Sequence, residues 1–304
     1  MRSVPYRELS ALTLFLWAAV SIPAVIPPAP GRIIDIGGTK LHLNCTGTGS
    51  PAVILESGFP GVSLDWVLVQ PEIAKFTRVC SYDRAGFGWS SLGKQPRTGN
   101  QIADDLHELL SVAGVTPPYV LVGHSVGGIY VRIFTTKHPD QVIGMVLVDS
   151  THEGALAYDF RSYWTPRSQA ASKSTDEPPL RFPPQVDSLL GQMSRTETWK
   201  TGEQQERAAI NTIMNEVPKP PMRLPMIPLL VLTAGEPLVW SDSASAGAWK
   251  HQQLQKELST LSAQGEWMAV PGANHYIQLS KPAAVVDAIQ RVVNATRALQ
   301  PAHR

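Results

Sequence analysis

Residues 119–128 read Tyr-Val-Leu-Val-Gly-His-Ser-Val-Gly-Gly, and this stretch decides the fold. Its apolar beginning is typical of a buried strand, whereas residues 126–137 show the spacing of a helix. The G-x-S-x-G motif at 123–127 therefore lies at a strand-to-helix turn, which exposes the hydroxyl of Ser125 at the edge of a sheet. The start of the following helix supplies free N–H groups and partial positive charge beside that oxygen. The stretch predicts Ser125 as a catalytic nucleophile.

Short apolar runs alternate with helical patterns around this stretch. A hairpin pattern covers residues 32–45, where Gly37-Gly38-Thr39 separates two strand-like runs. A hairpin followed by alternating strands and helices predicts an α/β fold with a mostly parallel sheet, helices on both faces, and ligands at the carboxyl ends of the strands. Further strands are expected at 52–56, 77–82, 119–123, 142–149, 228–233 and 266–270, and helices at 64–76, 100–113, 126–137, 244–261 and 282–298.

The alternation stops between residues 151 and 225, where prolines are frequent and no strong strand pattern appears. Proline lacks the N–H that a central strand needs, so this segment favours short helical pieces over sheet. We therefore predict a helical cap at 151–225, inserted into a core formed by residues 31–150 and 226–304.

The N-terminal residues differ from the rest of the chain. Arg2 and Arg7 precede an uncharged stretch over residues 9–26, and several prolines follow it. A basic start before an apolar segment is typical of a secretory signal, and the length of the segment also fits an uncleaved membrane anchor. We expect residues 1–30 to be one or the other, and the protein to be exported: secreted, periplasmic or attached to a membrane through this segment.

The overall composition narrows the classes of partner. The chain has 304 residues and a formal net charge of +1, with no basic run, so we expect no nucleic-acid partner. The sequence contains neither an H-E-x-x-H motif nor a cluster of cysteines and histidines, so we expect no metal and no cofactor. The sequence leaves the oligomeric state open.

A serine hydroxyl needs a base to accept its proton, and the chain offers eight histidines. His275 follows the last predicted strand on a loop, so we expect it to be the base. An acid must then orient the imidazole and stabilise its charged form. Asp149 closes one predicted strand and is the first choice, while Asp242 and Glu236 in the loop after the next strand are alternatives.

Hydrolysis by a serine also needs two donors for the oxyanion that forms in the transition state. One is expected to be the backbone N–H of Val126, directly after the nucleophile. The other should come from the Ser-Gly-Phe-Pro-Gly turn at 57–61, which follows a predicted strand. The N–H of Phe59 is the donor that we expect there.

Together these residues resemble the α/β-hydrolase superfamily over nearly the whole chain after the N-terminal segment. Besides the G-x-S-x-G motif, residues 82–90, Tyr-Asp-Arg-Ala-Gly-Phe-Gly-Trp-Ser, look like the family's D-x-G-x-G-x-S-type stretch after its fourth strand. The turn at 57–61 looks like its oxyanion loop, and residues 274–282 look like its histidine loop. The family's usual acid after the seventh strand is missing at its normal spacing, but some members place the acid where Asp149 stands. The resemblance implies an eight-stranded-type sheet and a serine esterase or lipase.

The resemblance also bears on the two cysteines. In this superfamily the second and fourth strands are neighbours, and these strands would carry Cys45 and Cys80. A disulfide between them is therefore implied, and it fits export, while two buried thiols are the alternative.

A serine nucleophile excludes relatives that use an aspartate, such as epoxide hydrolases, and leaves acyl transfer. We expect a hydrolase that cleaves a small-molecule carboxylic ester through an acyl-enzyme at Ser125, with His275 and Asp149. The alternatives are an aminopeptidase, a C–C hydrolase or a cofactor-free haloperoxidase on the same scaffold, or a non-catalytic binding protein.

Overall fold

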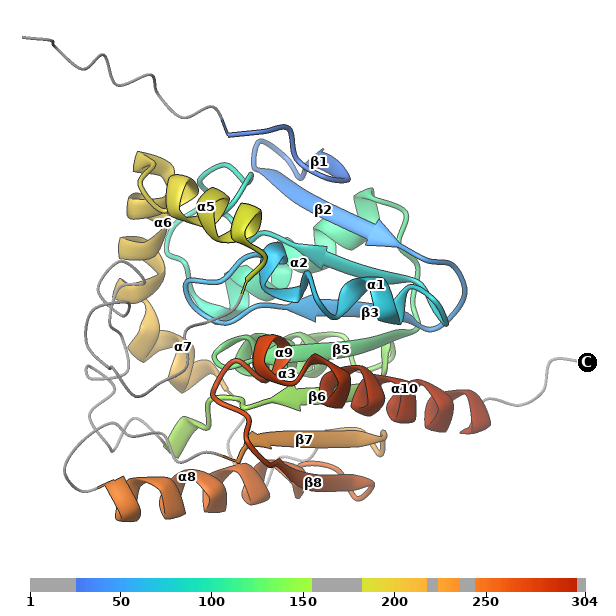
Figure 1. Ribbon diagram of the computed structural model, residues 1–304. Coiled ribbons are helices and arrows are strands. Elements are labelled where there is room, and N and C mark those ends of the chain that lie inside the picture. Colours follow the sequence, from blue (N-terminus) through green and yellow to red (C-terminus); the bar gives the residue numbers. More distant parts are fainter. Residues whose placement is uncertain (1–25, 155–181, 218–223, 236–243, 300–304) are drawn as a thin grey trace, which may run out of the picture.

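The computed structural model describes residues 26–154, 182–217, 224–235 and 244–299 (Figure 1). Most of the segment predicted as a signal or anchor lies outside these residues, as do part of the predicted cap and both alternative acids, Glu236 and Asp242. Among the described helices, none combines the length and hydropathy that crossing a membrane requires.

Eight strands form one sheet in the order β1-β2-β4-β3-β5-β6-β7-β8. The first pairs, β1 with β2 and β2 with β4, are antiparallel, and all other neighbouring pairs are parallel. The predicted fold class is therefore confirmed. The strands are β1 (Arg32–Asp35), β2 (Lys40–Thr46), β3 (Ala52–Glu56), β4 (Val79–Tyr82), β5 (Tyr119–His124), β6 (Val142–Val148), β7 (Leu229–Ala234) and β8 (Gly265–Val270).

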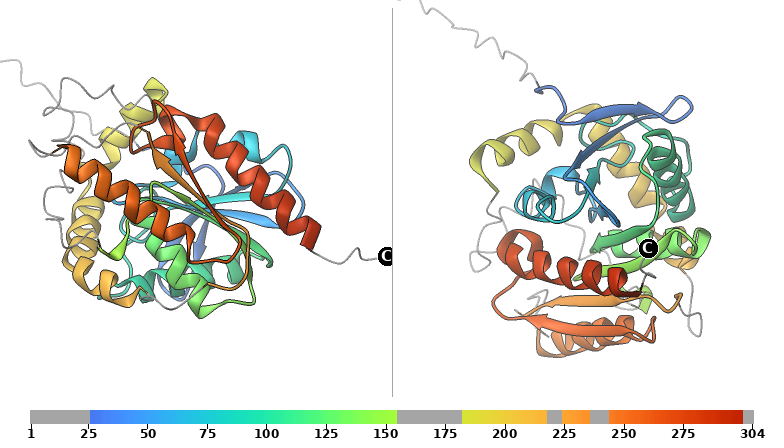
Figure 2. Two further views of the ribbon diagram at one scale, coloured as in Figure 1. Left: turned by 90° about the horizontal axis from the view of Figure 1, so that it is seen from below. Right: turned by 90° about the vertical axis from the view of Figure 1, so that its right-hand side faces the viewer.

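Helices cover both faces of the sheet. Helices α2, α3 and α8 lie on one face, and α1 and α10 on the other (Figure 2). Buried apolar side chains of each group pack against the face that the group covers. Every residue of the central strands β3 and β5 is buried, as expected for parallel strands between two helical layers. These helices and the short segments beside them are η1 (Ser63–Trp66), α1 (Gln70–Ile73), α2 (Gly99–Val112), α3 (Gly127–Lys137), α8 (Ala244–Ser259), α9 (Ile277–Ser280) and α10 (Pro282–Leu299).

One predicted helix is wrong. Residues 64–76 form not one helix but the 3₁₀ turn η1 and the short helix α1. Pro71 lies in the first turn of α1. Because proline has no N–H to donate to the preceding turn, it begins a helix more readily than it continues one.

Three further helices, here called the cap helices, lie between β6 and β7 in the chain, within the predicted cap. They are α5 (Pro184–Met193), α6 (Glu197–Ala208) and α7 (Ile210–Glu216), and they lie beyond the carboxyl ends of the parallel strands (Figure 1). Helix α6 approaches the loop after β4 very closely, since a Cβ on Gly86 would lie 2.6 Å from the Cα of Gly202. Beside this contact the rings of Phe87 and Trp199 meet edge to face. The close contact places α6 over the edge of the sheet where the G-x-S-x-G motif and the stretch at 82–90 lie.

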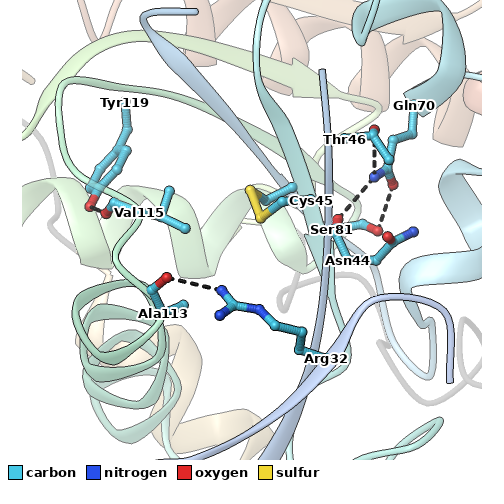
Figure 3. The surroundings of a disulfide bond; sticks show 10 residues. Arg32, Asn44, Cys45, Thr46, Gln70, Ser81, Ala113, Val115 and Tyr119 are labelled. Carbon is cyan, nitrogen blue, oxygen red and sulfur yellow. Dashed lines mark hydrogen bonds between the residues drawn. A yellow bond between two sulfur atoms is a disulfide. The ribbon is translucent and has the colours of Figure 1, made fainter. Parts of the chain in front are cut away.

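The structure joins Cys45 and Cys80 by a disulfide (Figure 3). The two residues face each other directly in the antiparallel pair of β2 and β4. Nearby, the amide of Gln70 donates to the carbonyl of Asn44 and accepts from the hydroxyl of Ser81. The covalent bond thus adds to an existing link between these two strands.

Candidate active site

Ser125 occupies a strained turn between β5 and α3. Its φ of +54° lies in the left-handed region, which costs a residue with a side chain on the order of 1 kcal/mol or more. Three backbone hydrogen bonds hold it there: its N–H donates to Val148, and its carbonyl accepts from Gly128 and Thr151. The surrounding backbone therefore imposes the conformation that lifts the hydroxyl out of the sheet edge.

The glycines of the motif are required by close backbone contacts. A Cβ on Gly123 would lie 2.6 Å from the Cα of Gly128, and one on Gly127 would lie 2.6 Å from the carbonyl oxygen of Ser57. A Cβ on Gly128 would lie only 1.9 Å from Oγ of Ser150. The pattern G-x-S-x-G-G thus follows from how tightly β5, α3 and the neighbouring strand ends approach one another.

His275 and Asp149 are joined at the same edge of the sheet. Nδ1 of His275 lies 2.7 Å from Oδ2 of Asp149, which directly follows β6 and is 1% exposed. Because an ionised carboxylate only accepts hydrogen bonds, Nδ1 carries the proton and Nε2 is left as a base. Ser125 and His275 line one pocket, so the residues predicted as nucleophile, base and acid come together.

Asp149 has a second histidine partner that sequence reasoning missed. Nε2 of His251, in α8, lies 3.0 Å from Oδ1 of Asp149, and the N–H of Ala234 donates to the same oxygen. Burial opposes the charge of Asp149, but His251 and His275 outweigh it and hold the pKa of Asp149 well below its usual range. Burial also opposes a charge on His251, but the Asp149 carboxylate raises the pKa of His251 above its ordinary value. The acid is therefore held ionised from both sides.

His124, directly before the nucleophile, supports the loop of the base. Its Nε2 lies 3.0 Å from the backbone carbonyl of His275, and the two rings are 4.7 Å apart. Burial, together with the neighbouring His275, lowers the pKa of His124 to about 3. His124 is therefore neutral and donates its proton to the carbonyl, which fixes the backbone of His275.

The turn at 57–61 lies against the nucleophile. A Cβ on Gly58 would be 2.9 Å from Nδ1 of His124 and 3.0 Å from the Cβ of Ser125, so a side chain here would force these residues to shift. The N–H of Gly61 donates to the carbonyl of Gly58 and closes the turn. Phe59 lines the same pocket as Ser125, and Val126, the residue after Ser125, is the N-cap of α3. The two residues predicted as oxyanion donors therefore flank Ser125.

The pocket combines apolar walls with the polar side chains of Ser125 and His275. No group of side chains in the described ranges has the composition of a metal site. The remaining wall of the pocket is formed by residues of η1 and of the histidine loop. The lining residues are Gly58, Phe59, Pro60, Gly61, Asp65, His124, Ser125, His275 and Tyr276.

The sheet order, the strained serine turn and the joined His275 and Asp149 define an α/β-hydrolase. The model of the alpha/beta hydrolase family matches residues 53–288, and the chain belongs to this family. The chain is a hydrolase, and the predicted resemblance is confirmed.

Similar proteins span several kinds of hydrolase. An uncharacterized protein of Bacillus subtilis, YqjL, is 26% identical over 262 residues, which cover 86% of this chain and 91% of that protein. A variant of the epoxide hydrolase of Vigna radiata is similar in structure, with a TM-score of 0.68 and 18% identity over 86% of this chain and 98% of that one. A thermophilic esterase from Thermogutta terrifontis has a TM-score of 0.60 and 19% identity, over 87% and 97% of the two chains. At these identities the structural likeness shows the fold alone.

Proposed function

We propose that the protein hydrolyses carboxylic esters through an acyl-enzyme at Ser125. The observation that carries the proposal is the hydrogen bond between His275 and Asp149 beside a serine held at a strained strand-to-helix turn. A serine in this position needs an oriented base to become a nucleophile, and the imidazole supplies it.

In the first half-reaction, Oγ of Ser125 attacks the carbonyl carbon of the ester while Nε2 of His275 takes the hydroxyl proton. The carbonyl oxygen becomes an oxyanion and accepts hydrogen bonds from the N–H groups of Val126 and Phe59. When the tetrahedral intermediate collapses, the bond to the alkoxy group breaks and His275 returns the proton to the leaving alcohol. The products of this half are the free alcohol and an acyl ester on Ser125.

In the second half-reaction, water attacks the acyl carbon and gives a proton to His275. Collapse of the second tetrahedral intermediate releases the carboxylic acid, and the proton returns to Oγ of Ser125. Asp149 accepts from Nδ1 throughout and stabilises the imidazolium that forms in each half. Its buried, ionised carboxylate suits it to that role.

The identity of the nucleophile favours ester cleavage over epoxide opening. Epoxide hydrolases of this superfamily use an aspartate, and this chain has Ser125 at the nucleophile position. A serine attacks an acyl carbon readily when a base and two oxyanion donors are aligned with it. Phe59 and Tyr276 add apolar and aromatic wall to the pocket. We therefore take the substrate to be an ester with a small or medium-sized apolar acid or alcohol.

The proposal includes export. A disulfide such as that between Cys45 and Cys80 persists in oxidising compartments and is rare in the cytosol. The basic and apolar N-terminal stretch of the sequence is consistent with the same route.

The test is hydrolysis of p-nitrophenyl esters from acetate to palmitate by the wild type and by Ser125→Ala. Turnover in the wild type and its loss in the folded variant would support the proposal, and the chain-length profile would give the acyl preference. Labelling by a fluorophosphonate probe gives a second readout of Ser125. Absence of both turnover and labelling in the wild type would refute the proposal.

A further inference from the structure

The buried guanidinium of Arg84 contacts the turn at 57–61, which carries the proposed oxyanion donor Phe59. Its Nη1 donates to the carbonyl of Ser57 at 2.7 Å, and its Nη2 donates to the carbonyl of Gly58 at 2.8 Å. The carbonyl of Gly58 and the N–H of Phe59 belong to one planar trans peptide group, in which they point in opposite directions. A hydrogen bond that fixes the carbonyl of Gly58 therefore also fixes the direction of the Phe59 N–H.

The other side of the same guanidinium is bound to a cap helix. Nε and Nη2 of Arg84 donate to the two carboxylate oxygens of Glu206 in α6, at 3.1 and 3.0 Å. Nη1 also donates to Glu56 at the end of β3, at 2.7 Å. The five N–H groups of a guanidinium are then all occupied, one on Nε and two on each terminal nitrogen. Such a set of donors holds the plane of the group in one orientation.

Helix α6 is itself firmly anchored, so that Glu206 has little freedom to move. The hydroxyl of Tyr130 in α3 donates to Oε1 of Glu206 at 2.8 Å. The backbone contact between Gly86 and Gly202 lies one turn earlier on the same helix. All side chains of this network are buried, and electrostatic interactions are strong where water is excluded.

We propose that Arg84 is a positioning residue for the oxyanion donor at Phe59, and that Glu206 of α6 sets the position of Arg84. A cap helix is then part of the catalytic geometry and not only a cover over the pocket. This inference rests on the proposed ester hydrolysis. It concerns a charge network that no step of the reaction uses directly.

The first variant for the test is Glu206→Gln, which keeps the shape of the side chain but removes its charge. The second is Arg84→Lys, which keeps the charge but loses the planar set of donors. The matched control is Asp105→Asn, because Asp105 forms a buried ion pair with Arg97 at 2.6 Å that does not touch the turn. All three remove or weaken a buried ionic contact, so each is expected to lower the Tm.

The measurements are kcat and KM on the best p-nitrophenyl ester, and the inhibition constant of an alkyl boronic acid that adds to Ser125. Glu206→Gln and Arg84→Lys should each lower kcat by about tenfold and weaken the boronic acid similarly, because only transition-state contacts are disturbed. KM should stay within about twofold. Asp105→Asn should keep the wild-type kcat. If the folded Glu206→Gln and Arg84→Lys variants keep kcat within about twofold, the inference is wrong.

Two further measurements keep the result decisive. If Glu206→Gln does not fold, Tyr130→Phe removes one hydrogen bond from Glu206 and should lower kcat by about threefold, whereas an unchanged kcat would count against the inference. Backbone hydrogen exchange over residues 56–62 needs no turnover, and it should rise in Glu206→Gln but not in Asp105→Asn. A wild type with neither ester turnover nor fluorophosphonate labelling would refute the proposed function, while this exchange comparison would still decide whether Glu206 positions the turn.

Discussion

His251 in α8 donates from Nε2 to Oδ1 of Asp149 at 3.0 Å, while His275 holds the other oxygen of the same carboxylate. The carboxylate that orients the base is thus itself oriented by a second imidazole. A carboxylate held at both oxygens has less freedom to rotate away from His275. His251 therefore belongs to the support of the site although it does not line the pocket.

Replacing His251 should reduce both activity and stability. His251→Gln is expected to lower kcat by about three- to tenfold, since Asp149 keeps its bond to His275 but loses a charged partner. The raised pKa of His251 means that the folded state binds this proton more tightly than the unfolded chain does. The ion pair therefore stabilises the fold below about pH 6.5, and this contribution is lost as the pH rises through the folded-state pKa. The Tm difference between wild type and variant should be larger at about pH 5.5 than at about pH 9. Equal differences at both values would contradict the ion pair.

Asp149→Asn should be far more damaging to turnover than to folding. The amide can bond His275 only in the wrong tautomer or with a weaker acceptor, and the imidazolium loses its counter-charge. We expect a loss in kcat on the order of 10³- to 10⁴-fold. Asp242→Asn is the matched control, because Asp242 is an alternative acid that the sequence offers in the loop after β7. A larger loss from Asp242→Asn would move the acid to the loop after β7.

His124 should make the protein sensitive to mild acid. Its pKa of about 3 in the folded state lies below the ordinary value, so the unfolded chain binds this proton and the folded chain does not. Stability should therefore fall as the pH drops below about 6.5, by up to about 1.4 kcal/mol per pH unit from this group. His124→Asn should show a shallower loss of unfolding free energy between about pH 7 and pH 5, measured by chemical denaturation. An identical slope in the two proteins would show that folding does not lower the pKa of His124.

The disulfide should contribute to stability and not to catalysis. Cys45 and Cys80 are separated by 35 positions in the chain, and a bond that closes such a loop destabilises the unfolded state by about 4 kcal/mol. A reductant should therefore lower the Tm while kcat, measured at a temperature well below it, stays unchanged. Alkylation without reductant should leave the mass unaltered. Two added labels would show that the cysteines are free thiols.

Much of the fold follows from local patterns in the sequence. Apolar runs of strand length alternate with helical spacing, and this alternation predicts the sheet from residue 52 onward. The serine turn is equally readable, because Gly123, Gly127 and Gly128 each meet backbone or side-chain atoms that exclude a Cβ. His275 and Asp149 could be predicted from the order of elements in the chain, since each follows the carboxyl end of a strand.

The supporting contacts could not be predicted in the same way. His251 lies within a helix, and its reach to Asp149 depends on how α8 packs against β7, which no local pattern encodes. Glu206 lies in a polar cap helix, where no local pattern marks it as a buried residue, yet it is buried against Arg84. The split of residues 64–76 into η1 and α1 could have been anticipated from Pro71. Tertiary packing decides which charged residues face inward.

The contact between Gly86 and Gly202 has a consequence for engineering. Exchanging caps is an obvious way to move substrate preference between members of this family, and here α6 meets the core through bare backbone on both sides. An incoming helix with any side chain at this point would be held away from the loop after β4. Its carboxylate could then no longer reach Arg84. A working chimera of this protein therefore has to inherit the glycine pair and the Arg84–Glu206 pair as one unit.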